Sequence, residues 1–466
     1  MKRGNEMSDY KELKEKLFYS PKNGLLNDDY NAVEEFSKGY KDFLGASKTE
    51  RLCVKKSIEI LKAAGFQEFS YVEKYKAGDK VYINNRGKAL AVAVIGQKSV
   101  DNGTRIAAAH IDSPRLDLKP NPLYEDSELA LFKTHYYGGI KKYQWTTVPL
   151  ALHGVFCKKD GTTVEVSIGE EESEPCFVVT DLLPHLAADQ YKRPVGELIR
   201  GEELNVLIGS RPFLDDEGSE LVKLNILKML NEKYGIVEED FLSAEFECVP
   251  AGKPRDVGFD LSMIGSYGHD DRVCAYPCLM AAIGAKNPEY TAISILADKE
   301  EVGSDGNTGL NSAFLEHFIG FIAEMQGVNK DVALCNSKCL SADVNAAFDP
   351  TFPDVMEKKN AARINYGAVI TKYTGARGKG DTSDASAEFV AFIRKILDEN
   401  NVVWQTGELG KVDLGGGGTV AKYIANLGVD VVDLGVPVLS MHAPFEVVSK
   451  FDVYMTYKAV MALFEN

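Results

Sequence analysis

The sequence predicts an α/β fold, with a sheet covered by helices on both faces and a β-rich domain inserted between its two halves. Three observations predict it. Amphipathic helical patterns precede buried-type apolar runs within residues 1–114. Residues 115–255 differ, because short β-like runs there alternate with glycine, proline and acidic turns. After about residue 258, strand and helix patterns alternate, which is typical of a sheet with helices on both sides.

The N-terminal segment combines two helices with two strands. The first helix is indicated by apolar residues at helical spacing: Val33, Phe36, Tyr40, Phe43 and Leu44. A second helix contains Leu52, Ile58 and Leu61 and is expected to stop at Gly65. Apolar runs at 89–96 and 104–109 indicate strands, separated by turn residues at 101–103.

The middle segment predicts a second domain. Its strand patterns lie at 148–156, 163–168 and 176–180, and its one clear helical pattern lies at 221–230. We therefore expect an inserted β-rich domain at 115–255. The remaining segments, 1–114 and 256–466, would form one discontinuous α/β domain.

The C-terminal segment contains the alternating strand and helix patterns. Helices are expected at 275–283, 312–325, 385–397, 420–427 and 453–464. Strands are expected at 291–297, 331–335, 402–404 and 429–434. The loop at 375–381 is rich in glycine.

Composition limits the classes of partner. The net charge of −16 argues against nucleic acid and anionic membranes. No apolar run approaches the roughly 20 residues that span a bilayer. Eight cysteines in 466 residues do not form a disulfide framework, so we expect them to be reduced. These features predict a cytoplasmic protein.

Two adjacent carboxylates, Glu300 and Glu301, follow the apolar run at 293–297. At the end of a buried strand such a pair is costly unless a cation holds it. A hydrolytic metal site needs one carboxylate that ligates the ion and another that accepts a proton from water. The two glutamates could divide these roles, although a solvated surface turn is the more frequent meaning of such a pair alone.

Four further motifs place metal-type ligands where a strand or loop ends. They are His110-x-Asp112, His269-Asp270-Asp271-Arg272, Ser341-Ala342-Asp343 and Met441-His442-Ala443-Pro444. Side chains at the carboxyl ends of strands in an α/β sheet converge on one crevice. Two histidines and three carboxylates suit two zinc-class ions. Taken singly, each residue is more often structural: Asp343 as a helix cap, for example.

The motifs together resemble the aspartyl aminopeptidase family of metallopeptidases, within the wider clan of co-catalytic zinc aminopeptidases. The resembling segments are 108–114, 298–304, 341–343 and 434–442, and the resemblance extends over almost the whole chain. The segment 269–272 is more similar to glutamyl-type aminopeptidases of the same clan. The resemblance implies a central mixed sheet flanked by helices and removal of N-terminal residues from peptides.

The same resemblance implies the site residues. His110 and Glu301 would bind one zinc ion, and Asp343 and His442 the other, with Asp270 as the bridge between the two ions. Glu300 would be the general base that takes a proton from the activated water. Asp112 would fix the tautomer of His110. A cis peptide would follow Asp270. Cobalt or manganese are alternatives to zinc, because carboxylate-rich sites accept several ions.

The family further implies a homo-oligomer, a dodecamer built from dimers through the inserted domain. His185 lies in a segment that resembles one reaching a neighbour's active site, but Asp189 replaces a second family histidine. A carboxylate there would repel acidic substrates. Lys372 stands where the family has a basic residue near the substrate. Gly416 and Gly417 could offer backbone N–H groups to a peptide.

Two other functions stay open from the sequence. One is a metal-dependent deacylase or amidohydrolase acting on N-acyl amino acids, because related sites support related chemistry. The other is a non-catalytic self-assembling scaffold. A serine hydrolase is disfavoured, because the chain has no Gly-x-Ser-x-Gly motif.

Overall fold

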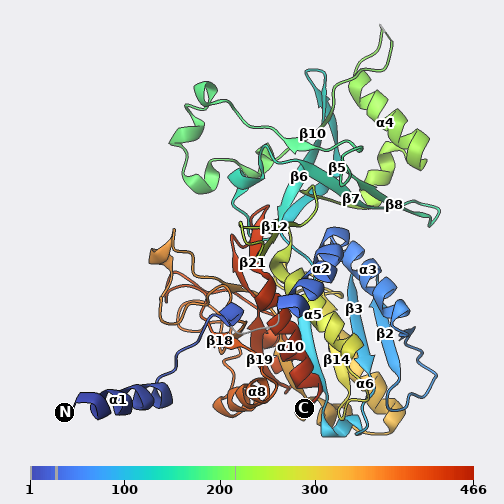
Figure 1. The fold of residues 1–466 in the computed structure, drawn as a ribbon. Coiled ribbons are helices and arrows are strands. Elements are labelled where there is room, and N and C mark those ends of the chain that lie inside the picture. Colours follow the sequence, from blue (N-terminus) through green and yellow to red (C-terminus); the bar gives the residue numbers. More distant parts are fainter. Residues whose placement is uncertain (1–2, 27–29, 216) are drawn as a thin grey trace.

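The computed structural model describes residues 3–26, 30–215 and 217–466. In this part of the chain the strands form sheets of nine, seven and five strands. Figure 1 shows the nine-stranded sheet in the lower body, between layers of helices, and the seven-stranded sheet in an upper lobe. Helix α1 (Arg3–Leu17) extends away from the lower body.

The nine-stranded sheet is mixed and is built from both ends of the chain. Its order is β1 (Gln67–Glu68), β2 (Lys80–Asn85), β3 (Ala89–Val94), β14 (Ala292–Ala297), β4 (Arg105–His110), β15 (Lys338–Ser341), β19 (Asp430–Gly435), β17 (Ala368–Thr371) and β18 (Trp404–Thr406). The strands β14, β4, β15 and β19 run parallel to one another. Strand β3 is antiparallel to β14, and β17 is antiparallel to β19.

Helices cover both faces of this sheet. One face packs against α2 (Tyr30–Ala46), α3 (Glu50–Ala63), α5 (His269–Gly284), α8 (Ala387–Glu399) and α10 (Lys450–Phe464). The other face packs against α6 (Phe314–Gln326), α7 (Lys330–Cys335) and α9 (Ala421–Ala425). In β3 the larger Leu90, Val92 and Val94 face the first group, and Ala91 and Ala93 face the second. Successive side chains of a strand alternate between faces, so β3 contributes to both cores.

The seven-stranded sheet is formed by residues between 115 and 250. Its order is β8 (Thr163–Ile168), β7 (Leu150–Cys157), β11 (Ala244–Pro250), β5 (Arg115–Asp126), β6 (Leu129–Tyr137), β10 (Val206–Gly209) and β9 (Val178–Val179). Helix α4 (Leu221–Tyr234) packs on the β5–β6 hairpin. The sheet has an apolar core of its own, which includes Trp145, Phe156 and Phe246.

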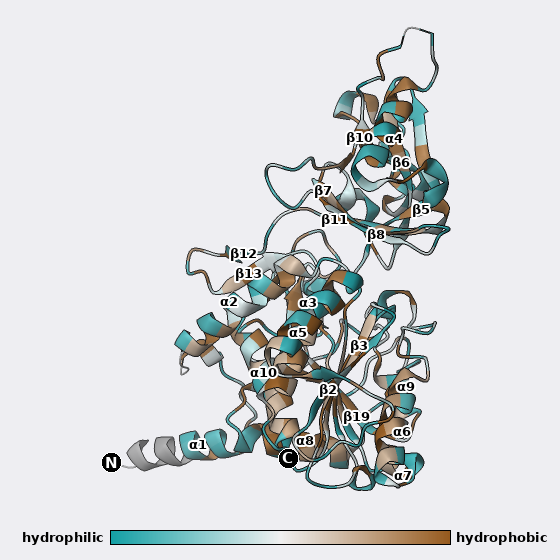
Figure 2. Cartoon of the chain, turned by 90° about the vertical axis from the view of Figure 1, so that its right-hand side faces the viewer, coloured by the Kyte–Doolittle hydropathy of each residue, from teal (hydrophilic) through white to brown (hydrophobic). Residues whose placement is uncertain are grey.

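The five-stranded sheet lies close to the junction between the two larger units (Figure 1). Its order is β12 (Arg255–Val257), β13 (Met263–Ser266), β21 (Glu446–Ser449), β20 (Pro437–Leu439) and β16 (Asn345–Ala346). Figure 2 shows brown, apolar stretches in the helices beside the nine-stranded sheet, with teal, polar residues interspersed along them. Among the described residues, no helix is both long and apolar enough to cross a membrane.

One predicted element is wrong. The run 331–335 is not a strand: it belongs to helix α7, and the strand β15 follows at Lys338–Ser341. The side chain of Asn329 accepts a hydrogen bond from the backbone N–H of Asp331 and so caps the helix. An apolar run of this length fits a strand or a helix turn equally well, and the cap decides between them. The strand expected at 402–404 lies two residues later, at Trp404–Thr406.

A buried cluster of charges joins the seven-stranded sheet to α3. The guanidinium of Arg115 lies 3.4 Å from Glu50 Oε2, 3.5 Å from Glu247 Oε1 and 2.8 Å from Asp117 Oδ1. Lys88 Nζ lies 3.3 Å from Glu50 Oε1. Burial opposes a charge on the inaccessible Glu50, but Arg115 and Lys88 hold its pKa at about 2. Arg115 therefore neutralises carboxylates from both units.

Replacement of Arg115 by methionine should destabilise the protein by about 3–5 kcal/mol, because Glu50 and Glu247 would remain buried with too little positive charge. The effect would be measured as a lower midpoint of thermal unfolding. The control is Lys159→Met, which removes the cation of the exposed Lys159–Glu239 pair and should cost less than about 1 kcal/mol. Equal effects of the two substitutions would contradict the importance of the buried cluster.

Candidate metal centre

Three adjacent parallel strands end at the same edge of the nine-stranded sheet, and each is followed by acidic or imidazole side chains. His110 is the last residue of β4. Glu300 and Glu301 follow β14 in a short 3₁₀ turn (Glu300–Val302), and Asp343 follows β15. Strands β14 and β15 both pair with β4, one on each side. The convergence expected at the carboxyl ends of the strands is therefore present.

Two further side chains come from loops of the five-stranded sheet. Asp270 lies in the first turn of α5, shortly after β13, and the peptide bond between Asp270 and Asp271 is cis, as expected. His442 lies in the loop between β20 and β21, with a positive φ of 64°. The site therefore lies where two sheets meet, and each sheet contributes part of it.

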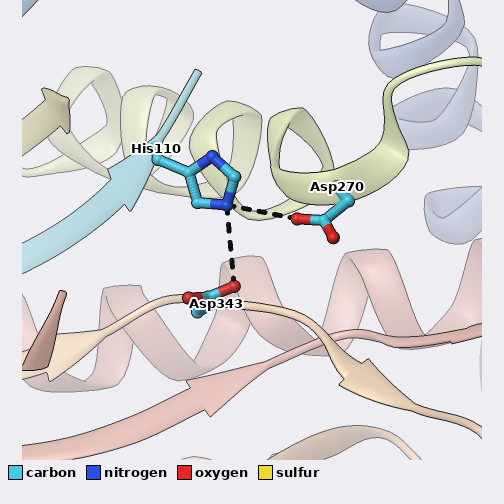
Figure 3. A group of neighbouring side chains, drawn as sticks. All are labelled: His110, Asp270 and Asp343. Atoms are coloured by element: carbon cyan, nitrogen blue, oxygen red, sulfur yellow. Dashed lines mark ion pairs between the residues drawn. The ribbon is translucent and has the colours of Figure 1, made fainter. Parts of the chain in front are cut away.

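Asp270 stands between the two histidines. Its Oδ1 lies 3.1 Å from His110 Nε2, and its Oδ2 lies 3.1 Å from His442 Nε2. Figure 3 shows the His110 ring directed towards both Asp270 and Asp343. One carboxylate thus faces two imidazoles through different oxygens, which is the geometry of a bridging ligand.

The remaining carboxylates pair with the histidines in the opposite way to the expectation. Asp343 Oδ1 lies 3.8 Å from His110 Nε2, and Glu301 Oε1 lies 3.5 Å from His442 Nε2. Three groups have donor atoms close enough to surround one ion: His110 with Asp270 and Asp343, Asp270 with Glu301 and His442, and His110 with Glu300 and Glu301. The ion-pair distances favour His110 with Asp343 and Glu301 with His442, and the expected pairing of His110 with Glu301 and of Asp343 with His442 stays a prediction. The order of residues along the chain does not reveal which side chains are neighbours.

Glu300 occupies a different position from Glu301. Its Oε2 lies 3.8 Å from His110 Nε2, and its side chain lines the cavity described below. The turn that holds both glutamates begins after Lys299 and ends at Gly303, both with positive φ. Burial, with the nearby charges of Asp112 and Asp270, raises the pKa of Glu300 to about 7. A carboxyl group with a pKa near neutrality can both accept and release a proton.

Asp112 is fully buried and holds the glutamate turn against His110. Its Oδ1 accepts a hydrogen bond from the backbone N–H of Glu300 at 3.1 Å and lies 3.3 Å from His110 Nδ1. Its Oδ2 accepts from the backbone N–H of Glu301 at 3.2 Å and from the Tyr137 hydroxyl at 2.8 Å. The carboxylate therefore fixes both glutamates. Together with the Asp112 main-chain carbonyl oxygen, which lies 3.1 Å from His110 Nδ1, it directs His110 Nε2 towards Asp270.

Glu446 is a residue that the sequence patterns did not single out. Its Oε2 accepts a hydrogen bond from the backbone N–H of Asp270 at 3.1 Å, and its Oε1 accepts from that of His442 at 2.7 Å. It thereby ties together two loops whose side chains face each other. Its position four residues after His442 was the only signal in the sequence. Burial and the charge of Asp270 raise its pKa to about 8.

A cavity of about 400 Å³ opens beside these residues. Asp270, Glu300, Glu301, Asp343 and His442 line it, and so do Gly416, Gly417 and the cation Lys422. The two glycines therefore lie where they could meet a substrate, as expected. Lys422 was not expected there. Its Nζ lies 3.6 Å from the exposed Asp381, so it is only loosely paired.

Two residues that were expected to bind substrate do not line the cavity of their own chain. Lys372 does not line the cavity, and its Nζ lies 3.0 Å from Asp384 Oδ1. His185 is exposed in a 3₁₀ turn (Pro184–Leu186) of the upper lobe. Asp189 is also exposed and pairs with Lys192 at 3.2 Å. Within one chain, neither His185 nor Asp189 lines the cavity.

The electrostatics of the centre favour a cation. Burial raises the pKa of Glu301 and of Asp343 well above the ordinary value, and neighbouring carboxylates add to the effect. Glu301 Oε1 is buried and has no hydrogen-bond partner among the described residues. Imidazole nitrogens with carboxylate oxygens are a donor set that zinc binds readily. The residues present therefore fit divalent cations.

Comparison with known proteins places the chain in a family. The family model described as aminopeptidase I zinc metalloprotease (M18) matches residues 43–464. A probable M18 family aminopeptidase 1 of Clostridium acetobutylicum is 52% identical over 94% of this chain and 97% of its own length. The crystal structure of an M18 family aminopeptidase from Thermotoga maritima has a TM-score of 0.93 and 48% identity, and the match covers 96% of this chain and all of that one.

A more distant match shows the fold alone. The structure of the S. cerevisiae mApe1 dodecamer has a TM-score of 0.76 and 19% identity, over 94% of this chain and 97% of that one. The family description agrees with the zinc-type donor set, and the structural match to the Thermotoga maritima protein agrees with the fold. The chain belongs to the M18 family of zinc aminopeptidases, which are metal-dependent hydrolases that act on peptides.

Proposed function

We propose that two divalent cations act at this centre and that Glu300 is the general base of peptide-bond hydrolysis. One cation would be held by His110, Asp343 and Asp270 Oδ1, and the other by Glu301, His442 and Asp270 Oδ2. The observation that carries the proposal is the position of Asp270, whose two oxygens each lie 3.1 Å from a different histidine. Zinc fits the donor set, with cobalt or manganese as alternatives.

When bound, the two cations would acidify a water molecule and polarise the carbonyl group of the scissile bond. Glu300 would accept a proton from the attacking water. As the carbon–nitrogen bond breaks, Glu300 would return that proton to the leaving amine. Its pKa of about 7 and its place on the cavity wall support both halves of this transfer. Asp112 would keep Glu300 in place through the backbone N–H of that residue.

The acidic wall of the cavity supports recognition of a free amino terminus. Asp270, Glu301 and Asp343 would be neutralised by the two cations, so Glu300 is a carboxylate on the cavity wall that would attract the cationic α-amino group of a peptide. Gly416 and Gly417 would contact the peptide backbone, and Lys422 would meet an anionic group of the substrate. An N-acyl amino acid lacks the cationic amine and would lose this attraction.

We also propose a homo-oligomer in which residues 115–255 form dimer contacts, and a dodecamer as the complete assembly. The dodecameric state of the mApe1 neighbour supports it. Exposed apolar side chains in the upper lobe support a covered surface: Leu182, Leu183, Leu186, Tyr191 and Val195. His185 and Asp189 lie in the same segment and would approach a neighbour's cavity in such an assembly. Light scattering that returned a monomer would contradict this assignment.

Substrates with a free amino group should be cleaved, and their N-acetylated counterparts should not. Aminoacyl-nitroanilides of Asp, Glu, Leu, Ala and Lys would be tested with and without a chelator. Chelator-sensitive release from the free amines alone is expected, and the ranking would give the residue preference. Release from the acetylated compounds would instead identify a deacylase. No release with zinc, cobalt or manganese would favour a scaffold.

Glu300→Gln should lower kcat by about 10²–10⁴, because the amide cannot accept the proton. Metal content, measured by elemental analysis after dialysis, should stay near that of the parent protein, since Glu300 is not assigned as a ligand. The same substitution at the exposed Glu399, at the end of α8, is the matched control and should leave kcat unchanged. A Glu300→Gln protein that kept most of its kcat would refute the assignment of the base.

Without metal, the protein should lose stability as the pH rises from about 5 to about 9. Burial raises the folded pKa of Glu300 to about 7 and of Glu446 to about 8, from an ordinary value of 4.5. A raised pKa stabilises the fold below the unfolded value, and that contribution is lost as the pH rises through the folded value. His442 acts with the same sign: burial opposes its charge, but Asp270 and Glu301 raise its pKa to about 10.

The measurement is the thermal unfolding midpoint against pH, for chelated and metal-loaded protein. The loaded protein should lose less stability over this range, because cations favour the charged carboxylates and binding to the folded state stabilises it. Parallel pH profiles for the two forms would show that these carboxylates do not respond to metal.

A further inference from the structure

We propose that residues 137–139 of the inserted segment complete the metal centre of their own chain, by fixing the ring orientation of both histidine ligands. The inserted segment then positions catalytic groups in addition to any role in assembly. The inference rests on the proposed function, because it treats His110 and His442 as metal ligands. It assigns two new positioning groups: the Tyr137 hydroxyl and the Gly139 carbonyl.

The first contact is made directly with a histidine. His442 Nδ1 lies 2.7 Å from the carbonyl oxygen of Gly139, while His442 Nε2 faces Asp270 at 3.1 Å. A carbonyl oxygen can only accept a hydrogen bond, so the proton of the neutral ring must lie on Nδ1. The lone pair is then on Nε2, which faces the bridging carboxylate. Gly139 therefore selects the tautomer in which His442 Nε2 can bind an ion.

The second contact acts on the other histidine through Asp112. The hydroxyl of Tyr137, the last residue of β6, donates to Asp112 Oδ2 at 2.8 Å. The other carboxylate oxygen of Asp112 lies 3.3 Å from His110 Nδ1, which also lies 3.1 Å from the main-chain carbonyl oxygen of Asp112. The guanidinium of Arg115 stacks on the Tyr137 ring, with 3.8 Å between the guanidinium carbon and the ring centroid. Tyr137 is thus held on one side by the buried charge cluster and holds Asp112 on the other.

Gly138 allows residues 137–139 to lie close to Glu301 and His442. Its φ is +74°, which favours glycine. A Cβ atom at this position would lie 3.1 Å from Glu301 Oε2, 3.3 Å from Glu301 Cβ and 3.4 Å from Pro114 Cα. A side chain would therefore push the segment away from Glu301 and move the carbonyl of Gly139. The backbone conformation at Gly138 places the next carbonyl on His442.

The two contacts together reach both halves of the centre. Gly139 acts on the half that contains His442 and Glu301, and Tyr137 acts on the half that contains His110. The three residues are contiguous: Tyr137 ends the β5–β6 hairpin of the upper lobe, and Gly138 and Gly139 immediately follow it. A purely architectural insert would not need a hydrogen bond to one histidine and a hydrogen bond to the aspartate that orients the other.

The test is Tyr137→Phe, which removes one hydroxyl and keeps the ring under Arg115. Loss of a group that orients a metal-ligating histidine typically lowers metal affinity about 10–100-fold, and we expect about tenfold here. Zinc affinity would be measured by competition with a chromophoric chelator, separately from activity. Activity lost at limiting zinc should be rescued by excess zinc. Tyr136→Phe is the matched control, because Tyr136 is the partly exposed neighbour on β6. The zinc affinity of this variant should stay within about twofold of that of the parent protein.

Gly138→Ala tests the carbonyl contact. It should lower zinc affinity and zinc-saturated kcat together, because His442 loses its acceptor, while far-UV circular dichroism stays unchanged. Parental zinc affinity in both Tyr137→Phe and Gly138→Ala would overturn the inference. A parent protein that binds no zinc, cobalt or manganese would instead overturn the proposed function, so the two failures are distinguishable. If Gly138→Ala unfolds, Tyr137→Phe still decides the question.

Discussion

The carboxylate of Asp270 is the interaction on which the centre depends. Each of its oxygens faces a different histidine, and the remaining acidic side chains lie on either side of it. Such a concentration of buried carboxylates is unfavourable without positive charge. The surrounding polypeptide restrains these groups through backbone N–H donors: those of Asp270 and His442 bind Glu446, and those of Glu300 and Glu301 bind Asp112. The fold therefore holds the anionic groups together in readiness for cations.

Two kinds of scaffold position the proposed ligands. Parallel strands β14, β4 and β15 end side by side, and hydrogen bonding along these strands fixes His110, Asp343 and the glutamate turn. Asp270 and His442 come from loops of the five-stranded sheet, whose strands β13 and β21 are paired. Loops are less constrained than strand ends, and this is where the additional carboxylate, Glu446, binds the backbone. The buried contacts between Arg115 and Glu50 then hold the upper lobe against α3.

The sequence alone was sufficient for the parts that rest on local patterns. Periodicity located α2, α3, α10 and the central strands, and the strand-end rule correctly brought His110, Glu300 and Asp343 together. It failed at 331–335, where a capping side chain outweighs an ambiguous apolar run. It also could not pair the carboxylates with the histidines, because that pairing depends on how two sheets pack. Glu446 and Tyr137 act through backbone or other side chains, so no spacing rule identifies them.

The separation of the ligands along the chain has a consequence for biosynthesis. His110 and His442 lie more than 300 residues apart, and Asp270 lies between them in sequence as well as in space. A nascent polypeptide on the ribosome cannot assemble the centre until residue 442 has been synthesised and the β20–β21 loop has folded. The proposed ligands of one cation, His110, Asp270 and Asp343, are all synthesised by residue 343, whereas the proposed site of the other cation stays incomplete until His442. Under the proposed two-cation mechanism, partly synthesised copies would be unable to hydrolyse peptides.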